Sequence, residues 1–188
     1  MHKIALTGAH GTGKTTLANE LTSKLASLGR LRACREAPRL IADSVGDQEF
    51  FRRGNNTPER QGMIFLEHVL EEQRQGADCD ILVTDRTLVD HLAYTTVLFP
   101  TGEQSREFAV YKRIAFETLA GYAAIFKVPI EFSLVDDGVR EADVVFQAAI
   151  DRKIDELYAE AGLTPEIVRG SIDQRASLVF ACVQKVIG

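Results

Sequence analysis

The sequence contains no tryptophan and only three cysteines, Cys34, Cys79 and Cys182, which lie far apart and form no C-x-x-C pair. Together with four dispersed histidines, this spacing argues against a disulfide framework and against a zinc site. No apolar run is long enough to span a membrane, and the first predicted strand begins too early to leave room for a signal peptide. We therefore expect a cytoplasmic protein whose cysteines are reduced and buried.

Basic residues are in the minority, with 22 Lys and Arg against 27 Asp and Glu, which gives a net charge of −5. This balance argues against a broad electrostatic surface for nucleic acid, although a local basic cleft near Arg52 and Arg53 stays open. No linker, repeat or low-complexity tract divides the 188 residues. We therefore expect a single domain over residues 1–188, large enough for a substantial core and a small lid.

The most informative stretch is Gly8-Ala9-His10-Gly11-Thr12-Gly13-Lys14-Thr15, followed by Thr16. It fits the phosphate-binding pattern G-x-x-x-x-G-K-[ST], with an apolar stretch before it and leucines at helical spacing after it. Glycines let successive backbone N–H groups turn towards phosphate oxygens, and the helix N-terminus adds its positive dipole. We expect Lys14 to reach the β- and γ-phosphates and Thr15 to ligate Mg²⁺. His10 either touches phosphate or fills a permissive position.

Short apolar runs alternate with helical patterns along the rest of the chain. Strands are expected over residues 3–7, 31–34, 81–85, 123–128 and 166–169, with helices between them. This alternation predicts an α/β fold: a three-layer P-loop sandwich with about five parallel strands, helices on both faces and right-handed crossovers. In the helix expected over 57–76, Met63, Leu66 and Leu70 indicate the apolar face.

Charged residues follow two of these strands, and ligands bind beyond the carboxyl ends of strands in such sheets. Asp85 could hold Mg²⁺ directly or through water, or it could cap a helix that begins near Thr87. We favour the metal role because a phosphate-binding loop needs a magnesium partner. Arg86 could contact the acceptor or the transferring phosphoryl group, with a surface salt bridge as the alternative. Glu36 can orient and deprotonate a hydroxyl.

Other arginines are candidates for anion binding. Arg39 could clamp an anion in a forked geometry, although solvent exposure explains it equally well. Arg140 lies in a polar turn, where an arginine on a closing segment could place positive charge on a transferring phosphoryl group. We place a lid around residues 136–153. For Arg152 we expect solvent exposure.

Taken together, these stretches resemble the ATP-binding, AAA-type domains related to bacterial nicotinamide riboside kinase, among the P-loop nucleoside and nucleotide kinases. The residues that carry the resemblance are Gly8–Thr16, Glu36–Arg39, Asp85-Arg86, and the segments 90–94 and 136–140. Glu36-x-Pro38 and Asp85-Arg86 also resemble deoxyribonucleoside kinases, in which the glutamate serves the acceptor hydroxyl and the arginine lies beside it. The resemblance implies Mg·ATP as donor, Arg140 as a lid arginine, and a place near the adenine for Arg175.

The leading hypothesis is a Mg-ATP-dependent kinase that transfers the γ-phosphoryl group to a nucleoside-like hydroxyl. The alternatives are a nucleoside monophosphate kinase and a P-loop ATPase or regulatory NTP-binding protein without a small-molecule acceptor. The sequence has no N-K-x-D stretch, which argues against a guanine-specific switch. The expected partners are ATP and a small-molecule acceptor, with neither nucleic acid nor membrane; a homodimer stays open.

Overall fold

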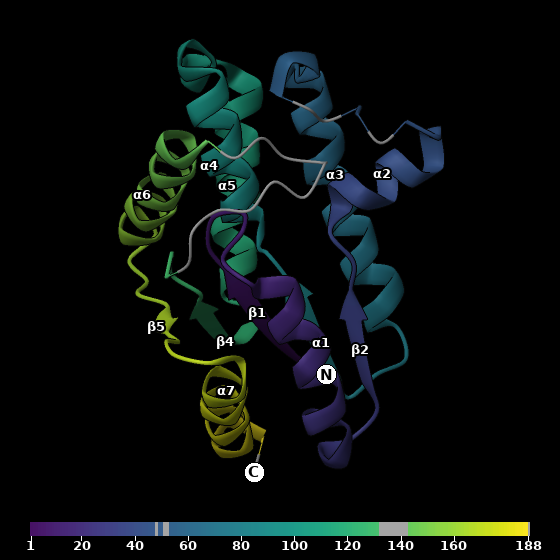
Figure 1. Ribbon diagram of the computed structural model, residues 1–188. Helices are drawn as coiled ribbons and strands as arrows, with labels where there is room; N and C mark the ends of the chain where they lie inside the picture. The colour runs from purple at the N-terminus through teal and green to yellow at the C-terminus, as the bar shows by residue number, and fades with distance from the viewer. Residues whose placement is uncertain (48, 51–52, 132–142, 188) are drawn as a thin grey trace.

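The computed structural model describes residues 1–47, 49–50, 53–131 and 143–187, and within them strands and helices alternate along the chain (Figure 1). The strands are β1 (His2–Thr7), β2 (Leu31–Cys34), β3 (Ile81–Asp85), β4 (Tyr122–Lys127) and β5 (Glu166–Ile167). The α-helices are α1 (Lys14–Leu25), α2 (Ala37–Val45), α3 (Pro58–Gly76), α4 (Leu88–Leu98), α5 (Arg106–Leu119), α6 (Val144–Glu160) and α7 (Ile172–Ile187). Short 3₁₀ turns lie at Ala26–Leu28, Arg53–Asn55 and Pro100–Gln104.

The five strands form one sheet in the order β2-β3-β1-β4-β5, and every neighbouring pair is parallel. The predicted α/β fold is therefore confirmed. After β1 the chain builds one half of the sheet, and after β3 it crosses to the other side of β1. Ligands bind at such a switch point in open α/β sheets. The register pairs Leu6 with Asp85, so β1 and β3 end side by side.

Helices cover both faces of the sheet, as expected. In Figure 1, α1 lies in front of the sheet, and α1 packs against α7. These two helices share a core with alternate residues of the strands, among them Ile4, Leu6 and Phe126. A second core joins α4, α5 and α6 on the other face. No helix of the described residues has the length and apolar character needed to cross a membrane.

The prediction that Met63, Leu66 and Leu70 form the buried apolar face of α3 is wrong. Met63, Leu66 and Leu70 are 43%, 53% and 48% exposed. The helix instead buries a mixed stripe that includes Phe65, whose ring lies 4.8 Å from that of Tyr111. Polar members of this stripe have hydrogen-bond partners, such as His91 for His68 and Tyr122 for Glu72. Such partners let polar side chains lie in the interior.

Two smaller expectations also differ from the structure. The last strand covers only Glu166–Ile167 and not residues 166–169, and its pairing with β4 ends at Ile167, beside Lys127 at the end of β4. Cys34 and Cys79 are buried free thiols, whereas Cys182 is only half-buried.

Candidate active site

The glycine-rich loop joins β1 to α1, and its three glycines, Gly8, Gly11 and Gly13, all have positive φ values that other residues rarely adopt. Gly8 has φ 139°, and a Cβ there would lie 2.5 Å from the carbonyl oxygen of Val128. Gly13 has φ 87° and stands immediately before Lys14, the first residue of α1. The loop therefore passes close to the end of β4 and leads directly into the N-terminus of α1, where unpaired backbone N–H groups and the helix dipole favour an anion.

Lys14 is buried against its own loop. Its Nζ donates hydrogen bonds to the carbonyl of Ala9 at 2.5 Å and to Thr12 Oγ1 at 3.2 Å. Burial, with the nearby Arg86 as the second cause, lowers the pKa of Lys14 to about 8. A phosphate anion beside this ammonium group would favour its charged form.

Thr15 and Asp85 meet beside the loop. Thr15 Oγ1 donates to Asp85 Oδ2 at 2.5 Å. The other oxygen, Asp85 Oδ1, is buried and accepts no hydrogen bond from the part of the chain that the structure describes. A hydroxyl and a carboxylate oxygen without a partner are hard ligands of the kind that Mg²⁺ prefers. The site therefore fits the metal that the sequence predicts.

The alternative role for Asp85, as a helix cap, is wrong. Thr87 is the N-cap of α4, and its side chain accepts a hydrogen bond from the N–H of Val89. Asp90 completes the capping box by accepting from the N–H of Thr87. Asp85 is the last residue of β3, and burial followed by the nearby Glu36 raises the pKa of its carboxyl. Bound Mg²⁺ would favour the ionised form.

Glu36 lies between two arginines. Its Oε1 accepts from Arg86 Nε at 3.1 Å, and its Oε2 accepts from Arg39 Nε at 3.2 Å. The side chains of Glu36 and Arg86 are each 3% exposed, whereas that of Arg39 is 44% exposed. Glu36 and Arg39 line the same cleft as the end of the glycine-rich loop, together with Gly11, Gly13, Lys14, Thr15 and Thr16.

Arg86 is buried beneath this cleft, so the surface salt bridge considered for it is wrong. Its Nη1 donates to the carbonyl of Gly8 at 3.2 Å, and its guanidinium carbon lies 5.1 Å from the centre of the Tyr94 ring. Its backbone has φ 98°, the one positive φ among the non-glycine residues that the structure describes. Such a conformation costs free energy and persists where surrounding contacts impose it. Burial opposes the charge of Arg86, but Tyr94, Glu36 and Asp90 raise its pKa.

His10 faces the helices on one side of the loop. Its Nδ1 lies 2.8 Å from Tyr94 Oη, and its carbonyl accepts a hydrogen bond from Gln147 Nε2 at 2.6 Å. The ring is also 5.7 Å from that of Phe146. The structure therefore places the His10 side chain against α4 and α6. Gln147 is absent from the sequence prediction, because no local pattern marks it as a partner of the loop.

Arg175 lies behind the loop and is almost fully buried. Its Nη1 donates to the carbonyl of Thr12 at 2.9 Å, and its Nη2 donates to Glu131 Oε2 at 2.6 Å. Its Nε donates to the carbonyl of Gly170 at 2.9 Å. These contacts connect α7 to the glycine-rich loop, and Glu131 is a member of the site that no sequence pattern indicated.

Two of the remaining predicted arginines, Arg140 and Arg52, lie outside the described residues. The role expected for Arg140 therefore stays a prediction. Of the expected lid around 136–153, the described part is Asp143, which caps α6, and the first turns of that helix. Arg152 is exposed, as expected.

The parallel sheet, the glycine-rich loop and the Thr15–Asp85 pair define a P-loop α/β protein with a nucleotide-kinase-like fold. A family model described as AAA domain matches residues 3–175. The chain belongs to this AAA domain family. A comparison with curated proteins finds no match.

Solved structures with the same fold include a NadR protein in complex with NR, with a TM-score of 0.75 and 18% identity over 100% of this chain and 52% of that chain. A thymidylate kinase from Ehrlichia chaffeensis has a TM-score of 0.68 and 15% identity, covering 97% of this chain and 98% of that one. A deoxyadenosine kinase from M. mycoides has a TM-score of 0.65 and 14% identity, covering 98% and 99%. The chain spans about half the length of the NadR chains. At these identities the likeness shows the fold.

Proposed function

We propose that this protein is a Mg-ATP-dependent kinase that transfers the γ-phosphoryl group of ATP to a nucleoside-like hydroxyl. The observation that supports this most is the shared cleft, which Lys14 and Thr15 line together with Glu36 and Arg39. A nucleotide-binding loop alone would suit any ATPase. A carboxylate in the same cleft can in addition orient and deprotonate an acceptor hydroxyl.

The donor side of the proposed site is the loop and its metal pair. Lys14 leaves Ala9 and Thr12 to contact the β- and γ-phosphates, while the loop N–H groups bind phosphate oxygens. Thr15 and Asp85 would hold Mg²⁺, which would supply positive charge to the transferring phosphoryl group. The resemblance implies that Arg140, on the lid, also supplies positive charge to the transferring phosphoryl group, and this role stays a prediction.

The acceptor side is Glu36. An ionised carboxylate accepts hydrogen bonds at both oxygens, and a substrate hydroxyl is a donor that such a group can bind. Glu36 would orient that hydroxyl towards the phosphoryl group and accept its proton. The arginines fix the direction of the Glu36 carboxylate, since Arg86 donates to Glu36 Oε1 and is itself held by the carbonyl of Gly8.

A second candidate, a nucleoside monophosphate kinase, is favoured by Arg39. This guanidinium is half-exposed on the cleft and could bind an acceptor phosphate. Glu36 would repel such a dianion: at about 4 Å and an effective dielectric near 20, one charge pair amounts to roughly 4 kcal/mol. The thymidylate kinase among the structural neighbours suits this candidate, whereas the deoxyadenosine kinase suits the first.

A screen of acceptors tests the proposal. Purified protein is incubated with Mg·ATP and a panel of nucleosides, nucleoside monophosphates and nicotinamide riboside, and ADP formation is measured with and without each acceptor. Lys14→Ala serves as the control for contaminating activity. ADP formation that depends on a nucleoside supports the proposal. ADP formation that no acceptor stimulates indicates an ATPase, and stimulation by monophosphates alone indicates the second candidate.

A further inference from the structure

Asp90 is a fully buried carboxylate that the proposed chemistry does not use. It stands in the first turn of α4, and its exposed fraction is 0%. An ionised group taken out of water is costly unless each of its oxygens is well bonded. The hydrogen-bond partners of Asp90 therefore indicate its role in the protein.

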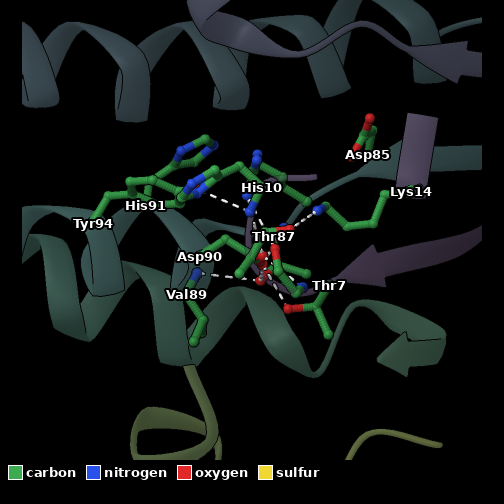
Figure 2. Close-up of polar contacts among 12 residues, drawn as sticks. Thr7, His10, Lys14, Asp85, Thr87, Val89, Asp90, His91 and Tyr94 are labelled. Carbon is green, nitrogen blue, oxygen red and sulfur yellow. Dashed lines mark hydrogen bonds and ion pairs between the residues drawn. The ribbon is translucent and has the colours of Figure 1, made fainter. Parts of the chain in front are cut away.

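The two carboxylate oxygens of Asp90 accept hydrogen bonds from different parts of the chain (Figure 2). Oδ2 accepts hydrogen bonds from the N–H of Thr87 at 2.9 Å, from Thr87 Oγ1 at 3.0 Å and from Thr7 Oγ1 at 2.8 Å. Oδ1 accepts from the N–H of Gly8 at 3.0 Å. One oxygen thus caps α4 and holds the end of β1, and the other holds the first residue of the glycine-rich loop.

The same turn also binds the other polar group of Gly8. Arg86 Nη1 donates to the Gly8 carbonyl at 3.2 Å and lies 3.7 Å from Asp90 Oδ1. The backbone of Val128 closes the third side, since a Cβ on Gly8 would lie 2.5 Å from its carbonyl oxygen. The N–H of Gly8 is therefore bound by Asp90 in the first turn of α4, and its carbonyl is bound by Arg86 in the β3–α4 connection. These two bonds fix the first residue of the loop.

We propose that Asp90 is a positioning residue for the nucleotide site, which orients the glycine-rich loop through Gly8 so that the following N–H groups converge on phosphate. The capping box by itself accounts for the bonds of Oδ2, whereas the hydrogen bond that Oδ1 accepts comes from Gly8 in the loop and not from the α4 backbone. This inference rests on the proposed function in one respect, the binding of ATP by the loop.

The two tasks can be separated with Asp90→Asn. The carboxylate accepts all four of these hydrogen bonds, so every partner group is a donor. An amide offers only one acceptor oxygen, and its other terminal group is an NH₂ donor. The amide oxygen is expected to take the position with three donors, which preserves the cap. The NH₂ group then faces the Gly8 N–H, so two donors meet and the loop contact is lost.

Isothermal titration of the full chain with Mg·ATP, well below the melting temperature, measures the effect. Asp90→Asn is expected to raise the Kd by about tenfold or more, as the loss of a hydrogen bond to a charged group implies. Ser105→Ala is the control for general destabilisation. Ser105 Oγ caps α5 by accepting from the N–H of Phe108 at 3.0 Å, and it does not line the cleft. This control should melt earlier and keep the wild-type Kd.

An Asp90→Asn protein that is folded and binds Mg·ATP with the wild-type Kd overturns the inference. If Asp90→Asn does not fold, hydrogen exchange of the wild-type Gly8 amide decides the question: strong protection supports the proposed bond, and exchange at the rate of a free amide overturns it. A wild-type protein that does not bind Mg·ATP overturns the proposed function as well. If the wild-type protein binds Mg·ATP and Asp90→Asn binds it equally well, only the proposed role of Asp90 is refuted.

Discussion

Replacing Glu36 with Gln is the change that separates the candidate acceptors. The amide is nearly isosteric but has one oxygen and one NH₂ group in place of two acceptors. Arg86 is buried and cannot move away, so we expect the amide oxygen to face its Nε, which lies 3.1 Å from the present carboxylate. The NH₂ group then faces Arg39, whose side chain is 44% exposed and can turn towards water. The fold should tolerate this exchange at a cost of about 1–3 kcal/mol.

The effect on turnover should be larger than the effect on stability. A general base contributes roughly 10²- to 10⁴-fold to the rate, which corresponds to about 3–5 kcal/mol in the barrier. With a nucleoside acceptor, kcat of Glu36→Gln should fall by that factor while the Kd for Mg·ATP stays within a few-fold of wild type, because the proposed partner of Glu36 is the acceptor hydroxyl and not a phosphate of ATP.

Steady-state kinetics with the acceptor from the screen, together with ATP titrations, provide the measurement. Glu71→Gln is the matched control: Glu71 is also a buried carboxylate, and it bonds to Gln75 Nε2 at 3.1 Å without lining the cleft. If Glu36→Gln uses a monophosphate better than the wild type does, the reasoning is refuted, because removing the carboxylate then relieves repulsion and the arginines are the acceptor clamp.

Three further outcomes are expected. Lys14→Ala should abolish turnover while the melting temperature stays near or above the wild-type value, because Lys14 is a buried ammonium whose pKa is lowered to about 8; retained turnover would contradict the kinase proposal. Asp85→Asn should lower kcat and raise the Mg²⁺ concentration for half-maximal rate by about tenfold, since it replaces a charged ligand oxygen; an unchanged Mg²⁺ titration would remove Asp85 from the metal site. Burial, and then the neighbouring His68, hold the pKa of His91 well below 6.5. The unfolded chain therefore binds a proton below pH 6.5 that the native protein does not, and stability should fall by about 1.4 kcal/mol per pH unit there. Urea unfolding at pH 7.5 and 5.5 should show this loss reduced in His91→Gln, and an equal loss in both proteins would contradict the assignment.

Local patterns were enough for the elements that depend on neighbours in the chain. The strand before Gly8 and the helix after Gly13 follow from an apolar run and from leucine spacing. Thr57 caps α3 by accepting a hydrogen bond from the N–H of Arg60 at 3.3 Å, as hydroxyl caps do. Asp90 could have been found in the same way, because it stands three residues after Thr87 in a capping-box arrangement. Its second partner, Gly8, is 82 residues away and has no local signature.

By itself, therefore, the sequence determined the glycine-rich loop, the alternation of strands and helices, and the carboxylate at the end of β3. These features rest on hydrogen bonds and apolar periodicity within a few residues. Only the tertiary structure decided which strands are neighbours, which side of α3 is buried, and that Arg86 and Arg175 hold the loop. The contacts responsible join residues far apart in the chain: 70 positions for Thr15 and Asp85, 163 for Thr12 and Arg175. Such pairs form only when the whole sheet is assembled, because their energies depend on burial and distance that no short stretch of sequence contains.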